Sequence, residues 1–191
     1  MNMQDGPLFS GQNIDALRST SRQRLDKALA GIGTVKECDD PATAARLLKD
    51  AQLELPELDR DKTTLTPSEE EGNNLTITAG FPVPQGWSLL EVRPNNFTLS
   101  PPVGRVDRYS VASGTPVLLI SRSFPRGTSP DAMKAWARKE ADVVDRWIEW
   151  LAVDVRMHNA GLEERIAAGL AERKRQLQDI DDLRDGLSGG I

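Results

Sequence analysis

The most regular pattern in the chain is an apolar stripe that runs from Pro130 to about Leu187. Apolar residues and one histidine recur every three or four positions, and only Glu140 and Arg173 interrupt the series. The members of the stripe are Met133, Trp136, Val144, Trp147, Leu151, Val155, His158, Leu162, Ile166, Leu170, Leu177 and Ile180. A spacing of roughly 3.7 residues per turn keeps one face of an α-helix apolar over many turns. We therefore predict a long amphipathic helix over residues 129–187.

A single helix over this segment would be roughly 85 Å long, and it must fold back, dimerise or carry another element along its side. The segment 158–161, His-Asn-Ala-Gly, could end one helix and start an antiparallel hairpin. Because the stripe keeps its phase across this segment, we predict a continuous helix. Acidic residues beyond Ile180 predict fraying at the negative helix end, and residues 188–191 are predicted to form a flexible tail.

Two shorter helices are predicted near the N-terminus. The first covers residues 14–30, with Asn13 as its cap and glycines after its end. The second begins at Asp40-Pro41, a capping residue followed by a proline suited to the first helical position, and ends before Pro56. Residues 57–73 are polar and contain an acidic run, so they are predicted to be a mobile connector.

Four short segments, residues 75–79, 87–93, 105–111 and 115–121, have the pattern of β-strands bounded by glycine and proline. The last of them carries Val-Leu-Leu-Ile and is predicted to be the central, most buried strand. No helical pattern lies between these segments, which favours an antiparallel sheet. The predicted fold class is therefore α+β. A small four-stranded antiparallel sheet and two N-terminal helices would form a globular domain over residues 1–128, followed by the very long C-terminal helix.

The composition of the chain limits the classes of function that it can have. The chain is 38% hydrophobic and 28% charged, which is typical of a soluble protein with a real core. A net charge of −5 argues against general attraction to nucleic acid or membranes, although a local basic face remains compatible with it. The single cysteine, Cys38, suits a reducing cytosol. No apolar segment is long enough to span a membrane and no signal peptide is evident, so we expect a cytoplasmic protein without a membrane partner.

Arginines gather in the predicted sheet region, with few acidic residues among them. They are Arg93, Arg105, Arg108, Arg122 and Arg126. Such arginines can bind phosphate, nucleic acid or an acidic partner, or they can form an ordinary solvated sheet face. The cluster Arg173, Lys174 and Arg175 on the long helix allows the same two interpretations, and nearby glutamates favour a charged surface with i, i+4 pairs.

The long helix also carries three of the four tryptophans, and Trp150 lies on a second apolar edge with Val143 and Met157. A helix that is apolar over more than one stripe is buried between two neighbours or contacts a partner. The predicted partner interface consists of Trp136, Trp147, Trp150, Leu151, Val155, His158, Asn159, Leu162 and Ile166. The expected partner is a second copy of the chain or an effector protein.

Asp154 and His158 are four residues apart on the helix, where a carboxylate could orient a histidine for base chemistry or metal binding. However, His158 is the only histidine, and no cysteine lies near it in the sequence. A histidine that is hydrogen-bonded inside the fold is therefore the favoured interpretation. We predict no catalytic residue, no metal and no cofactor.

Residues 146–159 (RWIEWLAVDVRMHN), followed by Leu162, Ile166, Arg173-Lys174 and Leu187, resemble a helix of uncharacterised bacterial conflict and phage-defence proteins. In that family the helix follows a small sheet and often precedes a restriction-endonuclease-like domain. The resemblance implies an N-terminal sensing or assembly module. The sequence stops at Ile191, where the effector domain would begin, so no nuclease residue is carried over.

Three functions are therefore considered. The first is a non-catalytic binding or assembly module, a regulatory or sensing subunit of a bacterial defence or restriction system that dimerises through its long helix. The second is a nucleic-acid-binding module that uses the arginines of the sheet. The third is a hydrolase or nuclease with a cryptic site.

Overall fold

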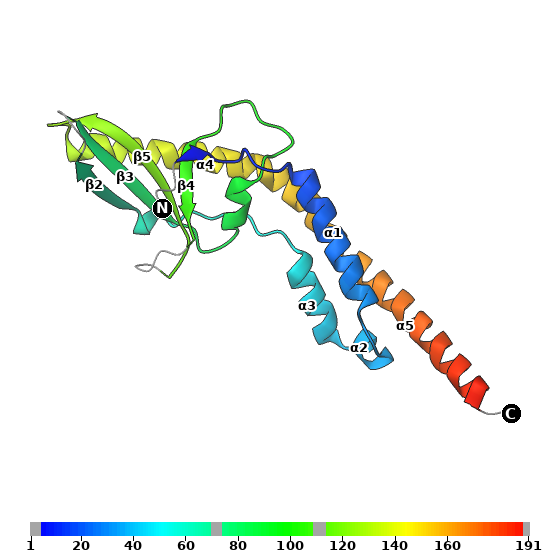
Figure 1. The fold of residues 1–191 in the computed structure, drawn as a ribbon. Helices are drawn as coiled ribbons and strands as arrows, with labels where there is room; N and C mark the ends of the chain where they lie inside the picture. The colour runs from blue at the N-terminus through cyan, green and yellow to red at the C-terminus, as the bar shows by residue number, and fades with distance from the viewer. Residues whose placement is uncertain (1–4, 70–73, 109–113, 189–191) are drawn as a thin grey trace. The chain divides into compact units, whose positions relative to one another are not determined.

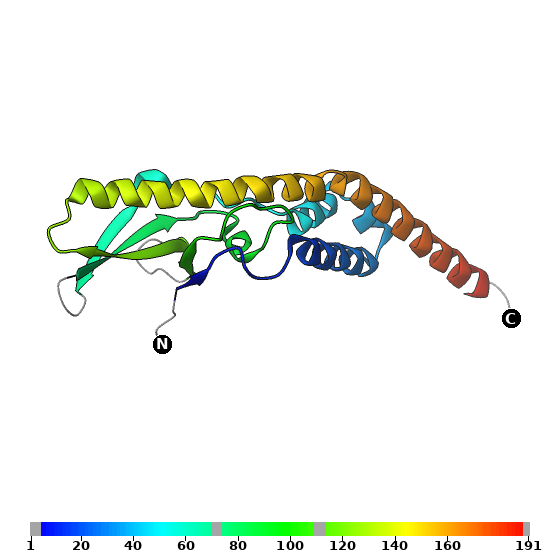
Figure 2. The same ribbon diagram turned by 90° about the horizontal axis from the view of Figure 1, so that it is seen from above.

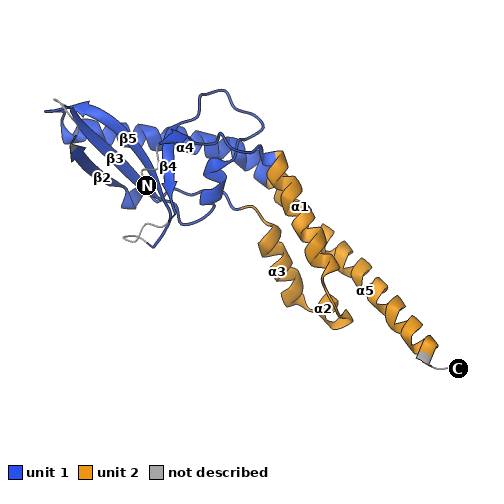
Figure 3. Cartoon of the chain, viewed as in Figure 1, with its two compact units in different colours: residues 1–14, 54–155 blue, residues 15–53, 156–191 orange. Residues whose placement is uncertain are grey.

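The computed structural model describes residues 5–69, 74–108 and 114–188. The chain divides into two compact units, each built from segments that are far apart in the sequence (Figure 3). Unit 1 comprises Met1–Ile14 and Glu54–Val155, and unit 2 comprises Asp15–Leu53 and Arg156–Ile191. The last of the three boundaries along the chain, between Val155 and Arg156, falls inside the long helix α4 (Pro130–Asn159).

In the described part of unit 1, five strands form one antiparallel sheet in the order β1-β4-β5-β3-β2 (Figure 1). The strands are β1 (Gly6–Pro7), β2 (Thr64–Glu69), β3 (Asn74–Pro82), β4 (Val103–Asp107) and β5 (Val117–Pro125). The antiparallel sheet and the central position of β5 confirm two predictions from the sequence. The predicted number of four strands is wrong.

The register between β3 and β5 separates an apolar face from a polar face, because residues paired across antiparallel strands point to the same side. Ala79 pairs with Ile120 and Phe81 pairs with Leu118, and all four side chains are buried. The polar face carries Thr76, Thr78, Ser121 and Ser123. There the hydroxyl oxygens of Thr78 and Ser121 lie 3.1 Å apart and share a hydrogen bond.

Within unit 1, helix α4 runs along the sheet (Figure 2). Its buried residues include Trp136, Val144, Trp147 and Leu151, which belong to the stripe identified in the sequence. The ring of Trp136 meets the edge of Phe124 on β5, with ring centroids 5.4 Å apart. The apolar face of the sheet is therefore covered by this helix, as the amphipathic pattern requires.

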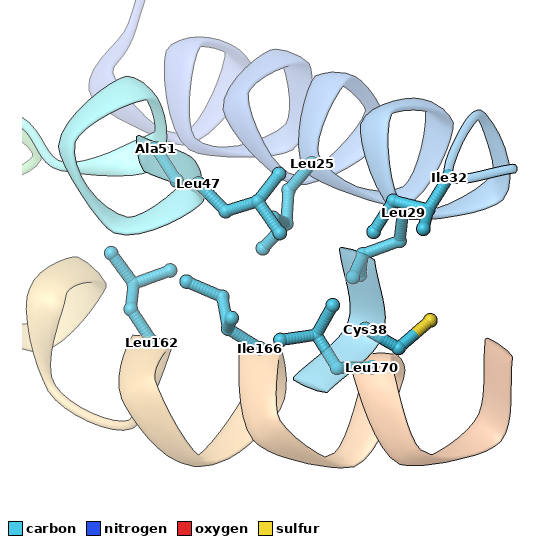
Figure 4. Packing of buried hydrophobic residues seen from close by; sticks show 9 residues of the cluster. All are labelled: Leu25, Leu29, Ile32, Cys38, Leu47, Ala51, Leu162, Ile166 and Leu170. Carbon is cyan, nitrogen blue, oxygen red and sulfur yellow. The ribbon is translucent and has the colours of Figure 1, made fainter. Parts of the chain in front are cut away.

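Unit 2 consists of helices α1 (Ile14–Ala30, from Asp15 onward), α2 (Val35–Asp39), α3 (Pro41–Ala51) and α5 (Leu162–Ser188), with the last residues of α4. Side chains from α1, α3 and α5 meet in one core, which Cys38 of α2 also joins (Figure 4). The core residues are Leu25, Leu29, Ile32, Cys38, Leu47, Ala51, Leu162, Ile166 and Leu170. Helix α1 has the predicted bounds, and Asp40 caps α3 by accepting a hydrogen bond from the Ala42 amide at 2.9 Å.

The strand predicted over residues 87–93 is wrong. Residues Trp87–Glu91 form the 3₁₀ helix η2 instead. Leu89 and Leu90 are neighbours in the sequence and both are buried, which a half-exposed strand would not allow. Gly86 begins this turn at φ +64°, a conformation that suits glycine. The strand predicted over residues 105–111 begins earlier, at Val103, and residues 109–111 lie outside the described part.

The connector predicted over residues 57–73 is wrong for most of its length. It contains the 3₁₀ helix η1 (Arg60–Lys62) and strand β2, which pairs with β3 from Thr64 opposite Gly80 to Glu69 opposite Leu75. Strand β2 lies at an edge of the sheet and contains Pro67. An edge strand can be polar and can hold a proline, so its composition resembles that of a loop. Residues 70–73 lie outside the described part.

The prediction of one continuous C-terminal helix is also wrong. Helix α4 ends at Asn159, α5 begins at Leu162, and Gly161 between them adopts φ +79°. This left-handed conformation interrupts a right-handed helix and is disfavoured for residues with a Cβ atom. The predicted fraying beyond Ile180 is absent, because α5 continues to Ser188. Of the predicted tail, residues 189–191 lie outside the described part.

Candidate functional site

Most of the predicted partner interface is buried within the chain itself. Trp136, Trp147, Leu151 and Val155 are buried in unit 1, and His158, Leu162 and Ile166 are buried in unit 2. Trp147 is only 1% exposed; it stacks on Phe9 and on Phe97 at centroid distances of 5.2 Å each. The remaining two residues, Trp150 and Asn159, are half-buried. These side chains are therefore core residues, and a partner surface must be sought elsewhere on the helices.

Asp154 holds a loop of unit 1. Its carboxylate accepts hydrogen bonds from the backbone amide and the side-chain amide of Asn95, each at 3.1 Å. A buried carboxylate needs such partners to offset its lost hydration. Asp154 therefore has a structural role in fixing the start of the loop that follows Arg93.

His158 and Asn159 hold the chain after α3 in unit 2. His158 Nε2 donates to the Ala51 carbonyl at 3.0 Å, and the Ser21 hydroxyl donates to the same oxygen at 2.9 Å. The Asn159 side chain accepts from the Leu53 amide at 3.0 Å and donates to the Leu53 carbonyl at 2.9 Å. These bonds satisfy backbone groups at the end of α3 that the helix leaves unpaired. Among the described residues, no group of three or more His, Cys, Asp or Glu side chains is placed to hold a metal ion.

The arginines of the sheet region do not form one basic surface. Arg105 pairs with Leu119 in the register, and Arg122 lies three residues further along β5, so the two arginines project from opposite faces. Arg105 forms an ion pair with Asp5. Arg108 forms an ion pair with Glu91 and lies 4.8 Å from the ring centre of Trp87. Arg93 and Arg126 are exposed.

The basic cluster of α5 is engaged within unit 2. Arg173 donates to the Ile32 carbonyl at 2.8 Å, beyond the end of α1, and Lys174 forms an ion pair with Asp39 at 2.7 Å. Arg175 pairs with Glu172 on the same helix. Cys38, which lies nearby, is buried, and this burial raises the pKa of its thiol, as expected for an unreactive core residue. The cluster therefore helps to attach α2 and the end of α1 to α5.

The apolar residues of α5 that remain exposed lie near its C-terminal end. Ile180, Leu183 and Leu187 are 47%, 66% and 79% exposed, whereas Leu170 earlier in the helix is buried. The spacing of three and four residues places the three side chains on one face, which we call the distal stripe. Ile180 was part of the apolar series read from the sequence, but Leu183 and Leu187 were not recognised as interface candidates. The 3–4 spacing was the signal that could have identified them.

Comparisons with known proteins give no family for this chain. No protein-family model matches it, and neither the curated proteins nor the solved structures contain a significant match. Among the described residues, no helix is both long and apolar enough to cross a membrane.

Proposed function

We propose that the chain is a non-catalytic assembly module that pairs with a second copy of itself through the distal stripe of α5. The observation that carries this proposal is the exposure of Ile180, Leu183 and Leu187 on one face of a helix. Ile180 and Leu183 occupy positions a and d of one heptad, and Leu187 occupies position a of the next. Isoleucine at a and leucine at d favour a parallel two-stranded coiled coil.

Flanking charges favour the same orientation. With Ile180 at position a, Asp179 takes position g and Arg184 takes position e. In a parallel pair, position g of one helix lies near position e of the other, so Asp179 would face Arg184 of the second copy. In an antiparallel pair, like positions would meet and like charges would repel. In the single chain, Arg184 forms an ion pair with Asp181 at an N–O distance of 3.0 Å. An exposed ion pair of this kind contributes little to stability, so Arg184 can pair with Asp179 of the second copy instead.

The end of α5 also lacks the features that stabilise a helix by itself. All described side chains from Gln178 to Leu187 are exposed, and the last turn carries no basic residue to complement the helix dipole. Short helices without tertiary contacts are marginal in water. Burial of the distal stripe against a second copy would supply the missing contacts. Because only three apolar side chains per helix take part, we expect weak pairing, with a Kd on the order of 10–100 µM.

Sedimentation equilibrium over micromolar to submillimolar concentrations tests this proposal. The chain should show a reversible monomer–dimer equilibrium, and Ile180→Asp should leave only monomer because it places a charge at an interface core position. Gln178→Asp is the matched control, since it adds the same charge to the same turn on the outer face, and it should leave the equilibrium unchanged.

A charge exchange tests the orientation. Arg184→Asp should weaken pairing by up to about fivefold, the range expected for exposed ion pairs, and Asp179→Arg in the same chain should restore it. A monomer at all concentrations, or a dimer that Ile180→Asp leaves intact, would refute the proposal.

The resemblance to bacterial defence modules agrees with an assembly role, and a place in such a system stays a prediction. Nucleic-acid binding also stays a prediction. Its test is binding to DNA or RNA that weakens steeply as salt increases, because each phosphate contact releases counterions.

A further inference from the structure

The charges beside the distal stripe of α5 restrict the kind of helix that can cover it. Leu177 is the last apolar side chain of α5 that packs against the core of unit 2, and the helix continues beyond α1, α2 and α3 (Figure 1). Around Ile180, Leu183 and Leu187, this end of the helix carries four aspartates and a single arginine. The aspartates are Asp179, Asp181, Asp182 and Asp185, and the arginine is Arg184. The stripe is therefore apolar at its centre and acidic at its margins.

The acidic charge is not shared equally between the two sides of the stripe. In the heptad that places Ile180 at position a, Asp179 and Asp182 take positions g and c, which lie on the same side of the helix. Neither of these aspartates has an ion-pair partner among the described residues. On the other side, Arg184 at position e and Asp181 at position b neutralise each other. One side of the stripe thus carries two unpaired carboxylates, and the other side is neutral.

A second copy of the chain matches this pattern poorly. To face Asp179 of its partner, each Arg184 must leave Asp181, so one aspartate gains a cation while another loses it. Asp182 has no opposing cation in such a pair, because Arg184 is the only cation between residues 178 and 187. The two acidic ends also repel each other, and like charges disfavour a partner. Self-pairing through the stripe is therefore weak for an electrostatic reason as well as for its small area.

We propose that the preferred partner of the distal stripe is an amphipathic helix of another protein that is basic along one side. Such a helix would present apolar residues at its own a and d positions and lysine or arginine at e and b. In a parallel pair, positions e and b of the partner lie beside g and c of α5, so its cations would meet Asp179 and Asp182. The pair of Arg184 with Asp181 would stay intact. This proposal rests on the proposed function only in taking the distal stripe as the surface that pairs.

The preference can be expressed as a ratio of affinities. Each of two exposed ion pairs strengthens binding by up to about fivefold, and the repulsion between two acidic ends is removed as well. At low salt, a basic helix should therefore bind about tenfold more tightly than a second copy does. The weakly associated homodimer is then a form that a basic partner helix displaces.

Titration of the full chain into a fluorescein-labelled synthetic peptide, followed by fluorescence anisotropy, tests this proposal. The peptide has three heptads, with isoleucine at a, leucine at d, lysine at e and b, and glutamine elsewhere. It is kept at nanomolar concentration, where it does not pair with itself. A control peptide has glutamate in place of every lysine. The lysine peptide should bind about tenfold more tightly than the chain binds itself, and the glutamate peptide should bind at least about tenfold more weakly than the lysine peptide.

Variants of the chain separate the side of the stripe that carries Asp182 from the rest of the acidic end. Asp182→Asn should weaken binding of the lysine peptide by up to about fivefold, because one ion pair is lost. It should not weaken the homodimer, in which Asp182 has no opposing cation. Asp185→Asn is the matched control, since it removes the same charge from position f on the outer face, and it should leave peptide binding unchanged. Leu183→Asp should abolish peptide binding, because it places a charge at the centre of the stripe.

Two results would overturn the proposal: equal binding of the lysine and glutamate peptides, or binding of the lysine peptide that Leu183→Asp leaves unchanged. Sedimentation equilibrium of the chain without peptide reports on self-pairing separately. A chain that stays monomeric yet binds the lysine peptide through Leu183 would refute the homodimer and support the basic partner. A chain that self-associates but prefers neither peptide would support the homodimer and overturn the basic partner.

Discussion

Gly169 and Gly186 show how the same residue type has different roles along one helix. Both glycines lie in α5. A Cβ atom at residue 169 would come within 2.5 Å of Leu29 Cδ1 on α1, whereas a Cβ atom at residue 186 would meet nothing within 4 Å. Leu29 is buried in the core of unit 2, so it has little room to move away. Gly169 therefore permits the close approach of α1 and α5. Gly186 has no such packing role, and its low helix propensity only lowers the stability of α5.

We expect alanine to have opposite effects at these two positions. Gly186→Ala should stabilise α5 by roughly 0.5–1 kcal/mol, the difference in helix propensity between glycine and alanine. Gly169→Ala should destabilise unit 2 by about 1–3 kcal/mol, because overpacking of the core exceeds the gain in propensity. Urea unfolding followed by circular dichroism measures both changes. Stabilisation by Gly169→Ala would show that α1 is not packed against this part of α5.

At the scale of the elements, the short helix α2 depends on its first turn. Thr34 accepts a hydrogen bond from the Glu37 amide at 3.2 Å, and the Glu37 carboxylate accepts from the Thr34 amide at 3.0 Å. This reciprocal arrangement is a capping box, and it satisfies amides that the helix leaves unpaired. The hydrogen bond from the Thr34 side chain, followed by that from the Gly33 amide, lowers the pKa of Glu37. The cap is therefore strongest when Glu37 is ionised.

A lowered pKa in the folded state predicts how acid acts on this cap. Its contribution to stability is present at neutral pH, above the pKa of the unfolded chain, and it is lost as the pH falls through the folded pKa of Glu37. Glu37→Gln keeps the capping geometry but removes the charge. The parent should therefore be more stable than the variant at neutral pH, and the difference should shrink in acid. Urea unfolding at both pH values measures this; a difference that is the same at both would contradict the prediction.

The elements also show which patterns in the sequence were informative. The apolar periodicity of residues 14–30 predicted α1, and the capping pair Asp40-Pro41 predicted the start of α3. Both predictions succeeded because the signals that begin and end a helix lie close together in the sequence. Strand β2 was missed because an edge strand with one solvated face needs few apolar residues. The turn at Gly161 was missed because the stripe on either side kept its phase.

The candidate site was harder to predict than the fold. The stripe showed which residues are buried, but whether the chain itself or a partner covers them depends on the tertiary structure. Trp147 and Leu151 have the pattern of an interface, and they are covered by their own unit.

At the scale of the whole molecule, the proposed pairing through the distal stripe of α5 would make stability depend on protein concentration. A second copy that binds only the folded helix stabilises it by mass action. Four aspartates lie between residues 179 and 185, and repulsion between them would limit the proposed association. Added salt should screen repulsion between these aspartates in the pair.

We therefore expect the thermal midpoint to depend on protein concentration. Above the Kd, the midpoint should rise by roughly 1–2 °C for each tenfold increase in concentration. Calorimetry over two decades of concentration measures this shift. Ile180→Asp should abolish the shift, and a parent midpoint that stays constant would argue against self-association.

The construction of unit 2 from Asp15–Leu53 and Arg156–Ile191 has a consequence during synthesis on the ribosome. Helices α1 and α3 emerge early, but α5, which completes their core, is translated more than a hundred residues later. At about 5–20 residues per second, this delay is on the order of ten seconds. Leu25, Leu29 and Leu47 are then exposed on the nascent chain, where a chaperone can bind them until translation reaches Leu170.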